Sequence, residues 1–386
     1  MSFQGFRRND GTVGTRNHLL VVSTVVCANQ VARNVANSVE DARYITHPMG
    51  CGHLGADFMR VLSTLAGFGR NPNVAATLVV GLGCENMQAK LVADEIAKSK
   101  KPVQYITIQE EGGTIKATQK GIEILLDLSE EASEFEREKC DLSELILGLE
   151  CGGSDATSGL VGNPAVGVAA DTVVKAGGTV ILPEATEWIG AEHLLAKRAV
   201  NEEIGKKIYA AVDKYISKVL SLGIDVRGTQ PTPGNIEGGI TTIEEKSLGT
   251  VCKAGNSPVQ DLLEYAENPP GKGLYLMDEP GLDIESITGL VAAGSQLITF
   301  TTGVGTPTGS PIAPVIKVTG NHRTFENMND NIDIDVSTIL EGKETLQQAG
   351  ERILKEILEV ASGKMTKAEI LKNREFAIYR AWQYMV

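Results

Sequence analysis

The 386-residue chain is long enough for two domains and a large buried core, and its apolar fraction of 42% is ordinary for a globular protein. The net charge of −13 argues against nucleic acid as a partner, because phosphates require a basic surface. No apolar run is long enough to cross a bilayer and the first residues lack the pattern of a secretory signal, so a cytoplasmic location away from membranes is expected.

Apolar strands and helices alternate along the first part of the chain. Strands are expected at 19–26, 43–47, 75–81 and 103–108, with helices at 28–39, 58–65, 89–99 and 115–128. This alternation predicts a parallel sheet whose strands are joined by right-handed helical crossovers. The Glu-rich stretch 129–139 is typical of an exposed helix or linker. We therefore assign residues 1–138 to a Rossmann-like N-terminal α/β domain.

The second part of the chain continues the same alternation. A strand at 144–149 opens it, and a Pro/Gly-rich loop at 229–239 divides it into halves. The first half contains helix 165–176, strand 179–182 and a long helix from 190 to 222. The second contains strands at 274–277, 296–301 and 315–318 and a mostly helical end from 345. These elements predict a larger catalytic α/β domain, residues 139–386, and the expected fold class is α/β with two domains.

Four of the six cysteines follow predicted strands; they are Cys27, Cys51, Cys84 and Cys151. The loops after parallel strands form the ligand-binding edge of a sheet, so thiols on that edge are expected to converge. Thiolates suit iron, an iron–sulfur cluster or zinc, and three of them would leave an open position for a substrate. The alternative is that each cysteine is a small buried apolar residue, as we assume for Cys140 and Cys252.

Three further segments carry polar groups suited to ligands. His47 and His53 flank Cys51 and suit metal ligands or acid–base groups, although a histidine satisfied by hydrogen bonds in a loop is equally compatible with the sequence. The loop 301–309 offers hydroxyl and N–H groups that suit a carboxylate or a phosphate. In the segment 238–249, Thr241 and Glu244 have the spacing of a helix capping box, which leaves Glu245 and Lys246 unexplained.

Seven or more motifs occur in the order found in a known family. They include Gly50-Cys51-Gly52, Gly81-Leu82-Gly83-Cys84-Glu85, Cys151-Gly152-Gly153-Ser154-Asp155 and the segments 5–17, 71–73, 163–167, 241–249 and 300–303. From about residue 5 to near its C-terminus, the chain resembles the catalytic region of altronate and galactarate dehydratases. Such enzymes usually begin with a small β-rich domain that is absent here. In this respect the chain is similar to the large subunit of sulfolactate sulfo-lyase, which works with a separate small subunit.

The resemblance implies β-elimination of water from a sugar acid such as altronate or galactarate, giving a 2-keto-3-deoxy acid, with a need for iron. We expect the iron, as Fe²⁺ or an iron–sulfur cluster, to be held by Cys51, Cys84 and Cys151. Cys27 is an alternative ligand. Lys246 is the expected general base, which requires its pKa to be lowered. His53 is the alternative acid–base group.

The remaining polar residues of the motifs are expected to complete the site. Arg16 is expected to clamp a substrate carboxylate with its two-pronged guanidinium. Asp155 and Glu245 are further catalytic candidates, with Glu245 directed to the metal shell or to a substrate hydroxyl. The other expected substrate-binding residues are Asn17, Ser154, Asn163, Thr301, Thr302 and Gly303.

Two rival functions stay open at this point. One is another lyase reaction on the same scaffold, such as elimination of sulfite. The other is a non-catalytic metal-binding subunit of a two-subunit lyase. The expected partners are a small sugar acid, a separate small subunit that supplies the missing domain, and further copies of the chain in a homo-oligomer.

Overall fold

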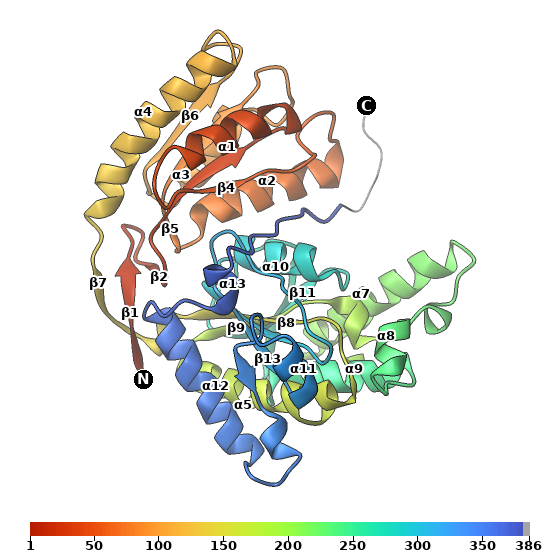
Figure 1. Ribbon diagram of the computed structural model, residues 1–386. Coiled ribbons are helices and arrows are strands. Elements are labelled where there is room, and N and C mark those ends of the chain that lie inside the picture. Colours follow the sequence, from red (N-terminus) through yellow and green to blue (C-terminus); the bar gives the residue numbers. More distant parts are fainter. Residues whose placement is uncertain (381–386) are drawn as a thin grey trace.

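A computed structural model of the protein describes residues 1–380. The chain forms two lobes, an N-terminal one coloured red to yellow and a C-terminal one coloured yellow-green to blue in Figure 1. The two-domain α/β class predicted from the sequence is confirmed, because both lobes are built on parallel sheets. In the described part of the chain, every helix is too short or too polar to cross a lipid bilayer.

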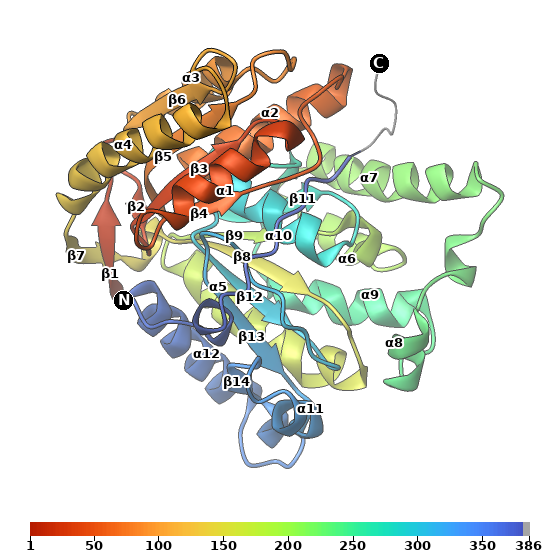
Figure 2. The same cartoon turned by 45° about the horizontal axis from the view of Figure 1, so that its top comes forward.

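The N-terminal lobe contains a four-stranded parallel sheet with strand order β4-β3-β5-β6. Its strands are β3 (His18–Ser23), β4 (Arg43–Ile45), β5 (Val74–Gly81) and β6 (Val103–Thr107). Its helices are α1 (Asn29–Asn37), α2 (Gly55–Arg70), α3 (Ala89–Ala97) and α4 (Thr114–Ser133). Helices α1 and α4 lie side by side on one face, and α2 and α3 cover the other (Figure 2). Burial on both faces explains why β3 and β5 read as continuous apolar runs.

The C-terminal lobe contains a seven-stranded parallel sheet with strand order β10-β11-β9-β8-β12-β13-β14. Its strands are β8 (Ile146–Cys151), β9 (Thr179–Leu182), β10 (Val259–Glu264), β11 (Gly273–Asp278), β12 (Leu297–Thr301), β13 (Val315–Thr319) and β14 (Ile334–Asp335). Helices α5 (Asn163–Lys175), α7 (Glu202–Leu220) and α12 (Leu346–Ala361) pack on one face, and α10 (Asp283–Ala292) packs on the other.

Shorter helices and turns surround the carboxyl edge and the end of the chain. They are the π-helical turn η3 (Ser158–Gly162), the 3₁₀ turns η4 (Ala185–Trp188) and η6 (Cys252–Ala254), and the helices α6 (Glu192–Ala196), α8 (Pro233–Glu237), α9 (Ile243–Val251), α11 (His322–Asn327) and α13 (Lys367–Ile370). The segment predicted as one helix from 190 to 222 is α6 followed by α7. The break is local, because Asn201 caps α7 by accepting a hydrogen bond from the N–H of Ile204 (3.0 Å).

The two lobes share a hydrophobic core and a small third sheet. Helix α2 packs against α10 so closely that a Cβ atom on Gly67 would lie 2.4 Å from the carbonyl oxygen of Ala292. The antiparallel strands β1 (Ser2–Arg7), β2 (Val13–Gly14) and β7 (Arg137–Asp141) form the third sheet, which joins the start of the chain to the link between the lobes. The stretch 129–139 is therefore partly α4 and partly β7, and the boundary at residue 138 stays a prediction.

Candidate active site

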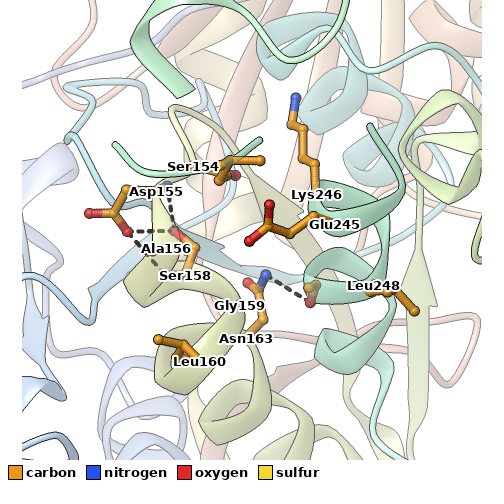
Figure 3. A pocket seen from close by; sticks show the side chains of 12 residues that line it. Ser154, Asp155, Ala156, Ser158, Gly159, Leu160, Asn163, Glu245, Lys246 and Leu248 are labelled. Atoms are coloured by element: carbon orange, nitrogen blue, oxygen red, sulfur yellow. Dashed lines mark hydrogen bonds between the residues drawn. The ribbon is translucent and has the colours of Figure 1, made fainter. Parts of the chain in front are cut away.

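The topology of the larger sheet places a crevice between β8 and β12. These strands are neighbours, but the chain leaves β8 toward β9 on one side and leaves β12 toward β13 on the other. Ligands of open α/β sheets bind at such a switch point, outside the carboxyl ends of the strands. A cavity of about 230 Å³ lies there (Figure 3), lined by Ser154, Asp155, Ala156, Ser158, Gly159, Leu160, Asn163, Ile240, Glu245, Lys246, Leu248 and Gly249.

Asp155 organises the loop after β8 rather than facing the cavity as a free acid. Its carboxylate accepts hydrogen bonds from the Thr157 hydroxyl (2.6 Å), the Ser158 N–H (3.0 Å) and the Asn321 amide (2.8 Å). A Cβ atom on Gly303 would lie 2.2 Å from Cγ of Asp155, so glycine is required where the loop after β12 passes. In this structure Asp155 holds the loops together, and its predicted catalytic role stays a prediction.

Only some of the other predicted substrate residues at this edge line the cavity. Ser154 and Asn163 line the cavity, whereas Thr301, Thr302 and Gly303 are not among its lining residues. Thr301 lies behind Asn163 and donates to its side-chain oxygen (2.6 Å), and the Asn163 amide donates to the Gly249 carbonyl (3.0 Å). The Thr302 hydroxyl accepts from the N–H of Gly305 (2.8 Å). The two bonds of Asn163 tie α5, β12 and α9 into one framework.

Helix α9 begins one residue later than the sequence predicts. Thr242, not Thr241, is the N-cap, and its hydroxyl accepts a hydrogen bond from the N–H of Glu245 (3.1 Å). The Glu245 carboxylate in turn accepts from the N–H (2.8 Å) and hydroxyl (2.6 Å) of Thr241. These hydrogen bonds lower the pKa of Glu245. Glu245 thus completes the helix start and also lines the cavity (Figure 3), so its predicted direction toward a substrate hydroxyl stays a prediction.

Lys246 forms an ion pair with Glu187, with 2.8 Å between Nζ and Oε1, and both side chains are 13% exposed. Burial alone would lower the pKa of Lys246, but the attraction and hydrogen bond of Glu187 outweigh it and raise the pKa. Lys246 is therefore cationic at neutral pH. The predicted role as general base, which requires a lowered pKa, is not supported by this geometry.

A second cavity of about 230 Å³ lies on the other side of Lys246. It is lined by Thr186, Glu187, Val226, Thr229, Gln230, Ile243, Lys246, Ser247, Pro280, Gly281 and Leu282. Both partners of the ion pair border this cavity, and Lys246 borders the first cavity as well. The Lys246–Glu187 pair is thus the charged group placed to meet a small acid at this edge.

Three glutamates that the sequence analysis missed lie buried behind this pair. Glu150 is the last residue but one of β8, Glu184 follows β9 and Glu279 follows β11, and these three strands are neighbours. Lys253 from η6 is also fully buried, with its Nζ 3.5 Å from Oε2 of Glu184. The strand-end rule that singled out the cysteines would have found these residues, had it been applied to acidic side chains.

Burial controls the ionisation of these acids. It raises the pKa of Glu150 and Glu279 well above the usual range of a glutamate. It raises the pKa of Glu184 to about 7, with the nearby Lys253 opposing the rise. The pKa of Lys253 is itself raised, because Cys151 and Glu184 outweigh the effect of its burial. Glu184 is therefore the member of the cluster that changes charge near neutral pH.

Cys151 belongs to this buried cluster. Its sulfur lies 3.7 Å from Oε2 of Glu184 and 3.8 Å from the hydroxyl of Thr250. Burial raises the pKa of its thiol to about 12, so the sulfur is protonated at neutral pH. The predicted cluster of Cys51, Cys84 and Cys151 is not assembled, because Cys151 is buried in the larger sheet whereas Cys51 and Cys84 are exposed after strands of the smaller one.

The other three strand-end cysteines lie on one edge of the N-terminal lobe. Cys27, Cys51 and Cys84 are exposed and follow the adjacent strands β3, β4 and β5. Their loops are in contact through backbone hydrogen bonds, such as the one from the N–H of Val26 to the carbonyl of Met49 (3.0 Å). Even so, among residues 1–380 no three histidine, cysteine or acidic side chains are grouped to hold a metal ion.

The two histidines beside Cys51 support the same loops. His53 accepts a hydrogen bond from the N–H of Gly50 (2.9 Å), and His47 lies 2.8 Å from the carbonyl oxygen of Ser23. Burial lowers the pKa of both, that of His47 to about 4, so both imidazoles are neutral at neutral pH. In this structure His53 is a hydrogen-bonded loop residue of the smaller sheet, and its acid–base role stays a prediction.

Arg16 and Asn17 precede β3 and lie at its amino end, which is opposite to the crevice. The Arg16 guanidinium binds both carboxylate oxygens of Glu369 (2.7 and 2.8 Å) and donates to the carbonyl of Val360 (2.8 Å). The Asn17 amide donates to the carbonyl of Ala132 (2.9 Å). Arg16 therefore already holds a carboxylate of the protein itself, and this geometry gives no support to the predicted substrate clamp.

Comparison with known proteins places the chain in a family. Residues 142–384 match the D-galactarate/altronate dehydratase C-terminal domain, and residues 5–133 match the D-galactarate dehydratase/altronate hydrolase second domain. The chain is 40% identical to (2R)-sulfolactate sulfo-lyase subunit beta of Chromohalobacter salexigens, over 99% of this chain and 98% of that one. It is 35% identical to altronate dehydratase of Bacillus subtilis, over 98% of this chain and 78% of the relative. It is 36% identical to galactarate dehydratase (L-threo-forming) of Escherichia coli, over 94% and 73%. The chain therefore belongs to the D-galactarate/altronate dehydratase family and is an enzyme of the lyase class.

Proposed function

We propose that the protein is a hydro-lyase that removes water from a sugar acid such as altronate or galactarate and releases a 2-keto-3-deoxy acid. The observation that carries this proposal is the Lys246–Glu187 ion pair, which borders two cavities at the carboxyl edge of the larger sheet. The family membership supports the same reaction class, because relatives named dehydratases cover 94% or more of this chain.

The reaction needs a base, a cation and a proton for the departing hydroxide. In our proposal the Glu187 carboxylate removes the proton next to the substrate carboxylate, and the Lys246 ammonium stabilises the negative charge that develops on the substrate oxygens. The bond from the neighbouring carbon to its hydroxyl then breaks as the C=C bond forms. Glu187 returns its proton to the leaving hydroxyl as water, and the resulting enol tautomerises to the keto acid. The raised pKa of Lys246 favours this cationic role over a role as base.

Iron binding remains part of the proposal, with a revised set of residues. Cys27, Cys51 and Cys84 offer three thiols on adjacent loops, which is the donor chemistry and number expected of an open iron site, as Fe²⁺ or a cluster. Their side chains are not grouped for ligation in this structure, so none of the steps above depends on iron. Bound iron would supply Lewis-acid chemistry.

A second candidate function is elimination of sulfite from a sulfonated hydroxy acid. It is favoured by the relative named sulfo-lyase subunit beta, which is 40% identical over 99% of this chain and 98% of its own. The word subunit in that name also supports a separate small chain as a partner. The two candidates share the base and the cation, and they differ in the leaving group.

A substrate panel distinguishes the candidates. Purified protein is incubated with altronate, galactarate and sulfolactate, and both 2-keto acids and sulfite are measured. We expect keto acid without sulfite, and release of sulfite from sulfolactate alone would replace the first proposal by the second. Lys246→Met should lower kcat at least about a hundredfold, whereas Lys207→Met, which removes an exposed paired lysine on α7, should not. Near-normal turnover of Lys246→Met would refute the proposed site.

A further inference from the structure

Two ion pairs stand one behind the other at the carboxyl edge of the larger sheet. Lys246 and Glu187 border the cavities, and Lys253 and Glu184 are buried. Thr250 joins the first pair, with its hydroxyl 3.4 Å from Oε2 of Glu187. Cys151 joins the second, at 3.7 Å from Glu184, and its sulfur meets the Thr250 hydroxyl at 3.8 Å. An unbroken series of polar contacts thus runs from Glu184 to Glu187.

The number of hydrogens makes this series depend on Glu184. It contains three contacts, but the Cys151 thiol and the Thr250 hydroxyl supply only two hydrogens between them. When Glu184 is ionised, the thiol donates to it and one contact lacks a hydrogen. When Glu184 is protonated, it donates to Cys151, Cys151 donates to Thr250, and Thr250 donates to Glu187. All three contacts are then satisfied, and the chain ends on the carboxylate at the cavity.

The backbone links the same two glutamates. Glu184 has φ +73° and ψ 63°, a left-handed conformation that is costly for a residue with a β-carbon. The turn that it begins is η4, in which the N–H of Glu187 donates to the carbonyl of Glu184 (2.8 Å). The strained residue therefore sets the position of Glu187 as well as contacting it through side chains.

Glu184 is surrounded by charged and titratable groups from several elements. They are Lys253, Glu187, Asp283, Glu150, Glu279, Lys246 and Cys151. Lys253 favours the ionised form of Glu184, whereas burial and the neighbouring acids favour the protonated form. Burial and the acids outweigh Lys253 and raise the pKa of Glu184 to about 7, so its proton is gained or lost within the range in which the enzyme is expected to work.

We infer that Cys151 and Thr250 connect Glu184 to Glu187, so that Glu184 is a positioning residue whose proton completes a hydrogen-bonded chain to the reacting carboxylate. Cys151 is thereby a link in this chain rather than an iron ligand. The inference rests on the proposed function, because it assigns Glu187 to the reaction. It adds a residue that touches neither cavity to the set that controls turnover.

Paired variants test the two links. Cys151→Ser and Thr250→Ser keep a group that both donates and accepts, and should retain kcat within about threefold. Cys151→Ala and Thr250→Val remove that group, and each should lower kcat about tenfold or more with little change in KM, as expected for losing a hydrogen bond to a charged group. Cys140→Ala, at a buried cysteine outside the site, is the control. Equal kcat values for the alanine and serine variants of Cys151 would overturn the inference, as would a loss of bound iron in Cys151→Ser.

The pH profile tests Glu184 itself. Glu184→Gln carries an amide that donates as the protonated acid does, so it should keep activity and remove an inflection near pH 7 from kcat/KM. An unchanged inflection would refute the role of Glu184. If no substrate of the panel is turned over by the wild type, the proposed function fails. The role of Glu184 is then tested by measuring the free energy of unfolding as a function of pH. Glu184→Gln must still abolish a pH-dependent part of that free energy.

Discussion

The buried carboxyl of Glu184 makes the stability of the protein depend on pH in a defined direction. Its pKa is about 7 in the folded chain, against 4.5 for a free glutamate, so the folded state binds the proton more tightly. The stabilisation is fully present below about pH 4.5 and is lost as the pH rises through 7. The pH dependence is opposite to that caused by an ordinary surface glutamate paired with a cation, whose contribution to the stability of the protein is lost as the pH falls.

The magnitude follows from the shift in pKa. The difference between 4.5 and about 7 corresponds to about 3 kcal/mol, because one pKa unit is worth about 1.36 kcal/mol. Glu150 and Glu279 also have raised pKa values, and their contributions are common to the wild type and a Glu184→Gln variant. The free energy of unfolding of the wild type, minus that of the variant, should therefore fall by about 3 kcal/mol between pH 5 and pH 8.

Denaturant unfolding at a series of pH values measures this difference. Trp188 is fully buried next to Glu187 in η4, so its fluorescence reports on the unfolding of the site. Glu130→Gln, at an exposed position of α4, is the matched control and should run parallel to the wild type. If the difference between the wild type and Glu184→Gln stayed constant from pH 5 to pH 8, Glu184 would not hold an additional proton in the folded state and the reasoning would be wrong.

Three further predictions follow from the same structure. Arg16→Met should lower the free energy of unfolding by about 3–5 kcal/mol, because it leaves Glu369 without its partner, and it should leave KM unchanged. A raised KM at normal stability would instead show that Arg16 binds the substrate carboxylate. Cys51→Ser and Cys84→Ser should reduce the iron bound after anaerobic purification, whereas Cys252→Ser should not, and equal iron in all three would exclude the proposed ligands. The chain alone should turn over slower than about 1 per second and accelerate when a small partner chain is added; rapid turnover by the chain alone would show that no partner is needed.

The sequence analysis located the candidate crevice but assigned its residues incompletely. The strand-end rule singled out the segment that begins at Cys151, and the motif 241–249 singled out Lys246; Ser154, Asp155 and Lys246 line one cavity in the structure. Glu184, which also follows a strand, and Glu187 were not identified, because acidic residues in loops are usually solvated and only the cysteines were considered at strand ends. The capping motif was predicted one residue early, since Thr241 and Thr242 are equally suitable N-caps and only the observed hydrogen bonds separate them.

The sequence by itself determined the central strands of both parallel sheets, because apolar runs and their periodicity reflect which faces of an element are buried. The runs at 18–23 and 74–81 are strands buried on both faces for this reason. Only the tertiary structure decided which strand ends meet. Sheet order makes β9 the neighbour of β8, which brings Glu184 to Cys151, while Cys51 and Cys84 follow strands of a separate sheet. Likewise Arg16 was a plausible substrate clamp until the chain end supplied Glu369, 353 residues away. Contacts at such separations are set by how the sheets and lobes pack, and no local pattern encodes them.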